Sequence, residues 1–243
     1  MSEAWFEHWF NTEYYFLLYQ HRDDAEAQRF LYRLLNTLQI PEGASILDIA
    51  CGKGRHSKVL ADAGMDVCGI DLSPNSIQAA SAHAGPHLRF AVHDMRIPFA
   101  HEQFDLAVNL FTSFGYTERA ADDQAALNAA YAALKHGGLF IQDYLNAKPV
   151  LGTLPQKQEL TRNEIRFNTH KYRDNGFIKK DIRVEDGTQQ FHFTEQVKIY
   201  SLEQLTALHQ ASGFIVKHIY GNQELEAYQD DTSPRIIIVS QKP

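Results

Sequence analysis

Short apolar segments alternate with amphipathic segments along most of the chain. The apolar segments are typical of strands that are buried on both faces of a sheet, and they lie at 45–49, 67–70, 88–92, 104–109 and 139–144. Helical spacing of apolar residues follows between them, at 24–38, 55–63, 73–84 and 118–136. A helix at 201–213 and strands at 214–220 and 235–240 complete the pattern. This alternation predicts an open α/β sheet.

One stretch has a different period. From 162 to 200, apolar and polar residues alternate as they do in strands, and two hairpin signals interrupt them, Asp174-Asn175-Gly176 and Asp186-Gly187. The pattern predicts a small, three-stranded antiparallel β insertion at 162–200. We expect it to lie over the carboxyl edge of the main sheet, as a lid or as a pocket wall.

The first 22 residues are unusually aromatic, with Trp5, Phe6, Trp9, Phe10, Tyr14, Tyr15, Phe16 and Tyr19. Because several of these rings fall near helical spacing, we expect residues 1–40 to form an N-terminal helical cap whose aromatic side packs on the body of the protein. Basic residues are nearly absent before Arg22, which disfavours a helix lying on a membrane surface.

Length and charge fit one globular domain over 1–243, with the cap and the insertion as elaborations. The 23 lysines and arginines are outnumbered by 30 aspartates and glutamates, which gives a formal net charge of −7. This balance disfavours nucleic acid or an anionic membrane as a partner. No apolar run approaches about 18 residues, and the start of the chain lacks a basic leader. With only two cysteines, Cys51 and Cys68, we expect a cytoplasmic protein.

A strand, a glycine turn and a helix follow one another at 45–63. Gly52 and Gly54 come soon after the apolar run, and the helical pattern starts at Arg55. Such a turn places backbone N–H groups and a helix N-terminus at the carboxyl edge of the sheet, where nucleotide-like ligands bind. Asp71 ends the next strand, seventeen residues after Gly54. That separation is close to the value of about 20 at which an acid binds the hydroxyls of a ribose.

The residues around this turn resemble a known family. The segment Asp48-Ile49-Ala50-Cys51-Gly52-Lys53-Gly54 resembles motif I, D-x-(G/A)-C-G-x-G, of the class I S-adenosylmethionine-dependent methyltransferases. Asp71 matches the ribose-binding acid of that family, His93-Asp94-Met95 its adenine-contacting segment, and 104–109 its fourth motif. The resemblance covers 45–144 well and the last two strands loosely. It implies a Rossmann-like, seven-stranded, mostly parallel sheet with helices on both faces.

The resemblance also implies where the ligands bind. S-adenosylmethionine, or its product S-adenosylhomocysteine, would contact residues of the motifs, namely Asp48, Ala50, Gly52, Gly54, Arg55, His56, Asp71, Leu72, Asp94, Met95, Asn109 and Leu110. In related methyltransferases the N-terminal segment closes over the cofactor, which adds Tyr15 and Tyr19. We expect a small-molecule acceptor near the ends of the fourth and fifth strands, beside Phe114, Tyr116, Tyr144 and Asn146.

Neither a catalytic base nor a metal site follows from the sequence. A base is needed only if the acceptor loses a proton, as a hydroxyl, phenol or ammonium would. The histidines are scattered without the spacing of metal ligands, so we expect no metal. The acceptor and the atom that is methylated stay open, and the protein is expected to be a monomer or a homodimer.

Three functions remain in competition. Methyl transfer to a small molecule explains all four motifs and the acidic net charge. An NAD-dependent oxidoreductase or epimerase would explain the glycine turn and Asp71, but not Asp48 or the segment around Asp94. Moreover, Ser57 stands where a dinucleotide fingerprint has Gly or Ala. A non-catalytic protein that binds S-adenosylmethionine fits the motifs equally well.

Overall fold

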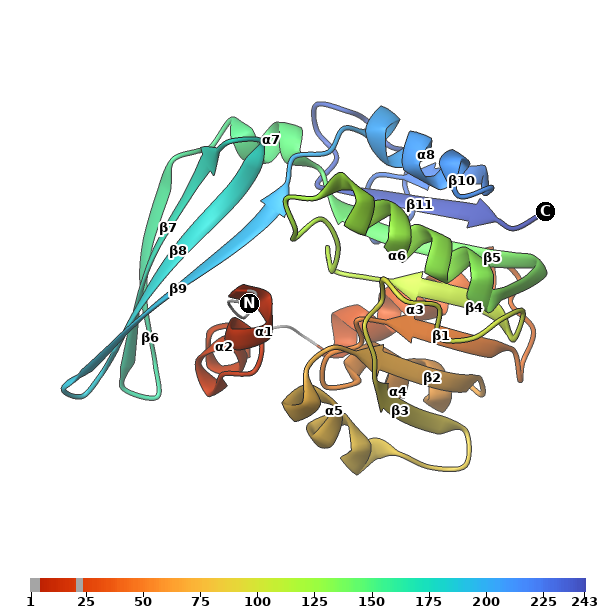
Figure 1. Cartoon of the computed structure of the whole chain (residues 1–243), viewed down its shortest axis with the longest axis horizontal. Helices are drawn as coiled ribbons and strands as arrows, with labels where there is room; N and C mark the ends of the chain where they lie inside the picture. The colour runs from red at the N-terminus through yellow and green to blue at the C-terminus, as the bar shows by residue number, and fades with distance from the viewer. Residues whose placement is uncertain (1–4, 21–23) are drawn as a thin grey trace.

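Two separate β-sheets organise the molecule (Figure 1). The computed structural model describes residues 5–20 and 24–243, so residues 1–4 and 21–23 of the expected N-terminal cap lie outside the described residues. The larger sheet has seven strands in the order β10-β11-β5-β4-β1-β2-β3, and the second has four in the order β6-β7-β8-β9. The predicted Rossmann-like fold with an antiparallel β insertion is therefore confirmed.

The seven-stranded sheet is mostly parallel. Its strands are β1 (Ser45–Ile49), β2 (Asp66–Asp71), β3 (Leu88–Val92), β4 (Phe104–Asn109), β5 (Leu134–Leu145), β10 (Ile215–Tyr220) and β11 (Arg235–Gln241). Strands β1 to β5 pair in parallel, whereas β11 pairs antiparallel with β5 on one side and with β10 on the other. The carboxyl ends of β1, β2 and β4 therefore meet at one edge, which faces the smaller sheet (Figure 1).

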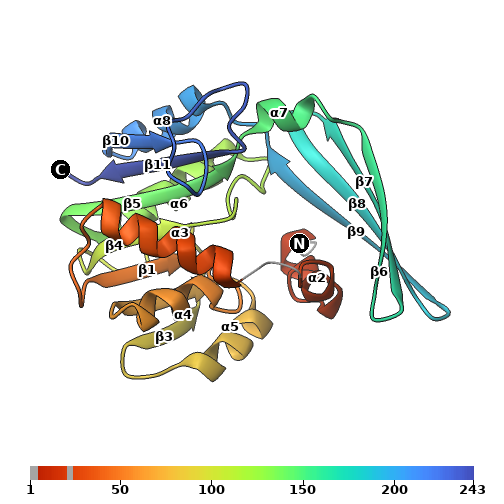
Figure 2. The same cartoon turned by 180° about the vertical axis from the view of Figure 1, so that it is seen from behind.

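Helices cover both faces of this sheet, as its alternating side chains require. Ile46 packs with the helices α3 (Asp24–Thr37) and α4 (Arg55–Asp62), which are nearest the viewer in Figure 2. Its neighbour Leu47 faces the other way, toward α6 (Ala120–Ala133) and α8 (Leu202–Ala211). Shorter helices connect the remaining strands, namely α5 (Pro74–Ala80), η1 (Ser81–His83) and α7 (Ala147–Leu151).

The boundary between α6 and β5 differs from the prediction of a helix that continues to residue 136 and stops at two glycines. The helix ends at Ala133, and β5 runs straight through Gly137 and Gly138. Backbone pairing explains the difference, because Gly137 N–H donates to the carbonyl of Lys242, and Lys242 N–H donates to that of Gly138. An alanine-rich sequence gave no signal for this pairing with the distant end of the chain.

The smaller sheet contains one strand more than the sequence predicts. It consists of β6 (Gln156–Arg162), β7 (Ile165–Asp174), β8 (Phe177–Asp186) and β9 (Gln189–Lys198), each antiparallel to its neighbour. The strand that the prediction of three strands over 162–200 omits is β6. Its sequence is polar on both faces, since it is an edge strand that is largely exposed, so it lacks the apolar alternation on which the prediction rested.

The aromatic N-terminal segment forms two short helices, α1 (Trp5–Trp9) and α2 (Glu13–Leu18), separated by the N-cap residue Thr12. They pack on the smaller sheet as well as on the body of the protein, where the ring of Tyr116 contacts those of Trp5, Phe6 and Phe10. Trp9 is 1% exposed, and its ring centroid lies 4.6 Å from that of Phe193 on β9. The aromatic side chains thus bury the apolar part of the insertion that would otherwise face solvent.

Candidate functional site

The chain turns sharply where β1 ends and α4 begins. Ala50, Gly52 and Gly54 all have positive φ, at 59°, 57° and 78°, a conformation that costs least for glycine. A Cβ on Gly52 would meet nothing within 4 Å, because this residue opens onto a cavity. A Cβ on Gly54 would lie 2.7 Å from the Phe90 ring. The first glycine keeps space for a ligand, and the second permits close packing inside the protein.

Asp71 connects this turn to the end of β2. Its two carboxylate oxygens accept hydrogen bonds from the backbone N–H of Gly52 at 2.9 Å and of Ser73 at 2.8 Å. Burial raises the pKa of Asp71, although both N–H groups counteract this effect. Each oxygen retains an acceptor direction, because an ionised carboxylate offers about four lone-pair sites. The carboxylate therefore lies at the cavity with capacity for further hydrogen bonds.

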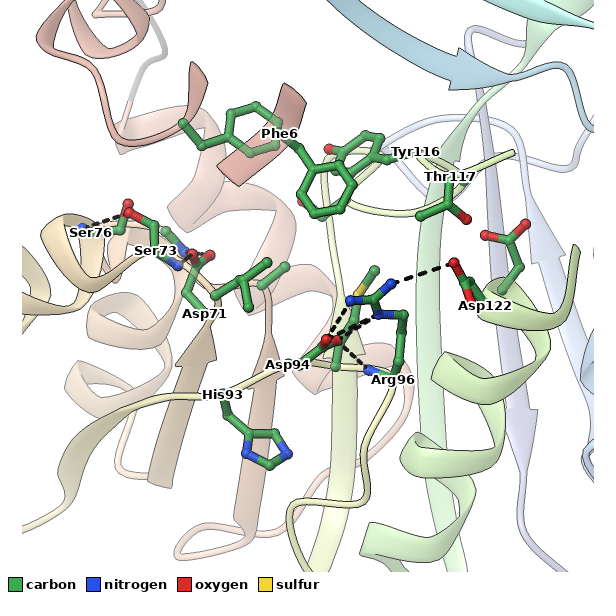
Figure 3. A pocket seen from close by; sticks show the side chains of 18 of the residues that line it. Phe6, Asp71, Ser73, Ser76, His93, Asp94, Arg96, Tyr116, Thr117 and Asp122 are labelled. Atoms are coloured by element: carbon green, nitrogen blue, oxygen red, sulfur yellow. Dashed lines mark hydrogen bonds and ion pairs between the residues drawn. The ribbon is translucent and has the colours of Figure 1, made fainter. Parts of the chain in front are cut away.

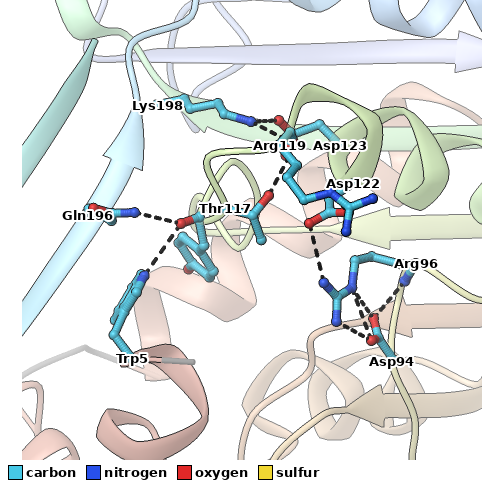
Figure 4. A network of polar contacts seen from close by, with 10 residues as sticks. Trp5, Asp94, Arg96, Thr117, Arg119, Asp122, Asp123, Gln196 and Lys198 are labelled. Atoms are coloured by element: carbon cyan, nitrogen blue, oxygen red, sulfur yellow. Dashed lines mark hydrogen bonds and ion pairs between the residues drawn. The ribbon is translucent and has the colours of Figure 1, made fainter. Parts of the chain in front are cut away.

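A second acid, Asp94, lies beyond β3 and is held by Arg96. The guanidinium donates to the carboxylate of Asp94 at 2.6 Å, and it also reaches Asp122 on α6 at 3.4 Å (Figures 3 and 4). Burial alone would raise the pKa of Asp94, but the hydrogen bonds from Arg96 lower it below its ordinary value. Asp94 is therefore ionised and fixed in place at neutral pH.

These residues line a first cavity at the carboxyl edge of the seven-stranded sheet. In Figure 3, Phe6 and Tyr116 lie across this cavity from Asp71 and Asp94. Seven residues that the sequence assigns to the cofactor line it, namely Tyr15, Ala50, Gly52, Asp71, Leu72, Asp94 and Met95. Tyr116, which the sequence assigns to the acceptor, lines it as well.

Asp48 lies beneath the turn rather than in the cavity. It is 1% exposed, and it accepts a hydrogen bond of 2.6 Å from the hydroxyl of Ser57 on α4. Burial raises the pKa of Asp48 to about 7, against the effect of the Ser57 hydrogen bond and with a contribution from the nearby Asp71. Position 57, which departs from the dinucleotide fingerprint, thus holds a serine that fixes the buried acid below the turn.

A second, larger cavity lies between the first one and the insertion. It measures about 400 Å³ against about 130 Å³ for the first cavity. Both are lined by Phe10, Tyr15, Ser113 and Tyr116, so the two spaces meet at these side chains. Tyr19, which the sequence assigns to the cofactor, lines only the second cavity. The structure thus provides two adjoining chambers with an aromatic junction.

Three residues that the sequence places beside the acceptor lie in neither cavity. Tyr144 is fully buried, and its hydroxyl donates to the carbonyl of Lys198 at 2.7 Å, which ties the end of β9 to β5. Phe114 packs in the same core. Asn146 caps α7 and donates to the carbonyls of Asp230 and Ser233. The expectation that these three contact the acceptor is therefore corrected, because strand-end position did not reveal which way each side chain points.

Besides Asp48, five residues assigned to the cofactor lie outside both cavities. Gly54 packs against Phe90, and Leu110 belongs to the core. Asn109 donates hydrogen bonds to the carbonyls of Ile49 and Ser113, which braces the edge of the sheet from below. Arg55 and His56 both lie beside the ring of Phe111. These side chains support the shape of the site from behind.

The insertion is attached to the main body at its last strand. Lys198 on β9 forms a buried ion pair with Asp123 on α6 (Figure 4). Tyr200 donates to the same carboxylate at 2.7 Å. Gln196 donates to the carbonyl of Tyr116 at 3.1 Å, and so does Trp5 at 3.4 Å. These contacts join the insertion, on one side of the second cavity, to the loop at Tyr116 on its other side.

The sequence did not reveal the polar residues of the second cavity. They come from the insertion and include Gln156, Gln158, Thr169, Lys171, Lys180, Glu195 and Gln196. Alternation within strands was the available signal, but it does not tell which face is turned toward the sheet edge. Within the described parts of the chain, no three His, Cys, Asp or Glu side chains are grouped to hold a metal ion. No helix found there is long and apolar enough to cross a membrane.

Comparisons with known proteins agree with this geometry. Residues 46–138 match a family model described as a methyltransferase domain. Over 131 residues the chain is 37% identical to the glycine/sarcosine N-methyltransferase of Parasynechococcus marenigrum, an alignment that covers 51% of this chain and 45% of the relative. The chain thus spans about half the length of the curated relatives that it matches.

Solved structures share nearly the whole fold. An S-adenosylmethionine-dependent methyltransferase from Clostridium acetobutylicum superimposes with a TM-score of 0.79 at 18% identity, over 94% of this chain and 95% of that one. The S-adenosylmethionine-bound amino pentose methyltransferase of Micromonospora echinaspora gives 0.74 at 20% identity, over 96% and 98%. The family match covers residues 46–138, and the solved structures show that the fold around this segment is shared over nearly the whole chain.

Proposed function

We propose that the protein transfers a methyl group from S-adenosylmethionine to a small-molecule acceptor, with the cofactor in the first cavity and the acceptor in the second. The observation that carries this proposal is the junction of the two cavities at Phe10, Tyr15, Ser113 and Tyr116. Methyl transfer is an in-line displacement, so donor and acceptor must approach each other from opposite sides of the methyl group. Two chambers that meet at one place satisfy this requirement.

The cofactor residues follow from the lining of the first cavity. Asp71 would accept hydrogen bonds from the two ribose hydroxyls. Its oxygens are oriented by two backbone N–H groups and keep free acceptor directions. Gly52 would allow the backbone to approach the ligand. Leu72, Asp94 and Met95 would bind the adenine, which offers both a flat apolar face and hydrogen-bond donors.

The bound cofactor would supply the reactive methyl group on a positively charged sulfonium. The chain's own residues would position the acceptor and exclude water. Phe10, Tyr15 and Tyr116 can do both at the junction, because aromatic faces attract a cation and leave little room for solvent. An NAD-dependent oxidoreductase or epimerase has no support among the relatives reported above.

The proposed setting is the cytoplasm. Cys51 and Cys68 are both buried and unpaired, which suits a reducing compartment. Burial raises the pKa of the Cys51 thiol far above its usual range, so this cysteine is not a nucleophile at neutral pH. The acidic net charge of −7 favours a small-molecule acceptor over nucleic acid.

A turnover assay tests the proposal. The purified protein is incubated with methyl-labelled S-adenosylmethionine and a low-molecular-weight cell extract, and labelled products and S-adenosylhomocysteine are measured by mass spectrometry. The proposal predicts protein-dependent label in a small molecule, with one S-adenosylhomocysteine released for each methyl group transferred. Tight binding of S-adenosylhomocysteine without transfer to any extract component would instead support a non-catalytic binding protein.

A further inference from the structure

A row of charged and polar side chains crosses the inner face of the insertion. Gln156 on β6, Lys171 on β7, Lys180 on β8 and Glu195 on β9 are direct partners in the strand register. All four line the second cavity. Since side chains two residues apart share a face, the neighbours of Lys180 on this face are Ile178 and Ile182, which are 3% and 0% exposed. On β8 the row therefore places a charged side chain between two buried apolar residues, over the cavity.

Two members of the row are already engaged with the N-terminal helix α2. Lys180 donates to the hydroxyl of Tyr19 at 2.9 Å, and Tyr19 donates to Glu195 at 2.7 Å. Glu195 also accepts a hydrogen bond of 2.7 Å from the indole N–H of Trp9. The only carboxylate among the described residues of this cavity is thus directed toward α1 and α2.

Lys171, unlike Lys180 and Glu195, forms no hydrogen bond with the described part of the N-terminal segment. Its ammonium has no hydrogen-bond or ion-pair partner among residues 5–20 and 24–243, although it is half-buried and lies directly opposite another lysine. Like charges facing each other across a strand pair destabilise a sheet. Burial first, and then the charge of Lys180, lower the pKa of Lys171, against a weaker influence of Glu195. A cation in this position is stabilised by an anion that enters the cavity.

We propose that the second cavity accepts a small molecule with a carboxylate group, and that Lys171 binds this carboxylate. The inference rests on the proposed function, since it assigns an acceptor class to the same site. Gln156 and Gln158 line the cavity on the adjacent strand, and their side-chain amides can donate further hydrogen bonds to the carboxylate. Aromatic side chains, among them Trp5 and Phe111, would contact the rest of the molecule.

The charge balance selects a single negative charge. Lys171 and Lys180 face one acid, Glu195, so the cavity carries one net positive charge among its described lining residues. That charge matches a carboxylate. A dianionic phosphate would leave one charge uncompensated in a partly buried site, and no arginine lines this cavity to form a bidentate contact within the described residues.

The position of Lys171 also decides what the carboxylate does. Lys171 lines the second cavity but is not among the four residues at the junction with the first. The carboxylate therefore anchors the acceptor, and a different atom of the same molecule receives the methyl group. Products should be acids methylated at a nitrogen, sulfur, carbon or ether oxygen rather than methyl esters.

Matched probes test this inference. Benzoate and benzamide have nearly the same shape but differ in charge, and their affinities for the protein saturated with S-adenosylhomocysteine can be compared by calorimetry. Benzoate should bind at least about tenfold more tightly than benzamide. Inorganic phosphate should bind more weakly than benzoate. Lys171→Met should abolish the preference for benzoate, and Lys171→Arg should retain most of it.

Lys157→Met is the matched control, because Lys157 is an exposed lysine of β6 next to Gln156 and is absent from the cavity lining. It should leave the preference unchanged. Equal or absent binding of both probes, a preference that survives in Lys171→Met, tighter binding of phosphate, or methyl esters as turnover products would each overturn the carboxylate site. Failure of S-adenosylhomocysteine itself to bind would overturn the proposed function instead.

Discussion

At the scale of single residues, cofactor binding should depend most on Asp71. Its carboxylate is oriented by two backbone N–H groups, so replacing it removes both an acceptor for ribose hydroxyls and a brace of the turn. Asp71→Ala should weaken S-adenosylhomocysteine binding by about 1.5–3 kcal/mol, or roughly 10–150-fold. Isothermal calorimetry measures the affinity, and circular dichroism melting confirms that the fold is retained.

Asp66→Ala controls for the loss of a carboxylate from the same strand. Asp66 begins β2, at the end opposite to Asp71, and forms an exposed ion pair with Arg89. Such a pair contributes about 0–1 kcal/mol, so this variant should bind as the parent does. An affinity of Asp71→Ala within about twofold of the parent would contradict the assignment.

The two glycines of the turn should separate binding from folding. Both have positive φ, so an alanine at either position is strained. Gly52→Ala adds a Cβ only to the cavity, and should weaken S-adenosylhomocysteine binding by about tenfold or more with a modest change in melting temperature. Gly54→Ala drives a Cβ into the Phe90 ring, and this overpacking should lower the unfolding free energy by about 1–3 kcal/mol more.

Scanning calorimetry and ligand titration on both variants measure the two effects. The larger loss of melting temperature should belong to Gly54→Ala. If Gly52→Ala bound the ligand like the parent while melting lower than Gly54→Ala, the assignment of the two glycines would be reversed.

Asp48 should make stability depend on pH. Its pKa in the folded protein is about 7, above the ordinary value of 3.8, so the folded state retains a proton that the unfolded state releases between these values. The contribution of Asp48 to stability is therefore largest in acid and declines as pH rises through this window, by up to about 1.4 kcal/mol per pH unit. Asp48→Asn keeps an acceptor for Ser57 and should remove the decline.

Urea denaturation of both proteins at about pH 4.5, 5.5 and 6.5 provides the comparison. The Asn variant should gain stability relative to the parent with each step toward neutral pH. Parallel pH profiles of the two unfolding free energies would show that Asp48 does not hold its proton in the folded state.

At this scale the sequence predicted which residue types form the site better than it predicted which way each side chain points. Asp71, Asp94 and Gly52 line the first cavity because motif residues at strand ends are fixed by backbone geometry. Tyr144 and Phe114 also follow strand order, yet their side chains pack into the core. Which face a side chain takes depends on the register of the whole sheet, and this information is not local.

At the scale of elements, the N-terminal helices and the insertion form one unit. The apolar face of the insertion is covered by Trp9, Tyr14 and Leu18, while the same N-terminal segment also supplies Phe6, Phe10 and Tyr15 to the first cavity. Removing the insertion would therefore expose the underside of both helices. The two chambers are not independent of each other.

Trp9→Ala should undock the N-terminal helices, because loss of a fully buried indole removes about 3–5 kcal/mol of packing. Hydrogen exchange of residues 5–18 should become much faster, and S-adenosylhomocysteine should bind more weakly, since the cavity loses part of its lining. Trp9→Phe should preserve most of the packing while losing the bond to Glu195.

Tyr32→Ala is the control for this experiment, since Tyr32 is an exposed aromatic residue on α3, with 36% of its surface accessible. It should leave exchange of the N-terminal helices unchanged. Unaltered exchange and ligand affinity in Trp9→Ala would show that the helices do not depend on the insertion.

Element prediction succeeded where a periodic apolar pattern was present. The strands β1 to β4 and the helix α8, with its capping box at Ser201, agree with the sequence to within a few residues. The sequence did not predict β6, because this strand has almost no apolar residues. It did not predict that α1 and α2 dock on the insertion, because an aromatic face does not specify its partner.

At the scale of the whole molecule, the net charge and the cavity charge have opposite signs. The chain carries a formal charge of −7, whereas the second cavity collects two lysines against one glutamate among its described residues. A negative surface does not attract anions from a distance, so selection of an anionic acceptor must act at short range within the cavity.

Thermal unfolding with ligands measures whether the first cavity binds S-adenosylmethionine or its product. S-adenosylhomocysteine at about 100 times its dissociation constant should add about 2.7 kcal/mol to the unfolding free energy and raise the melting temperature accordingly. NAD at the same concentration should produce no shift. Stabilisation by NAD, or no stabilisation by S-adenosylhomocysteine at any concentration, would show that the first cavity is not an S-adenosylmethionine site.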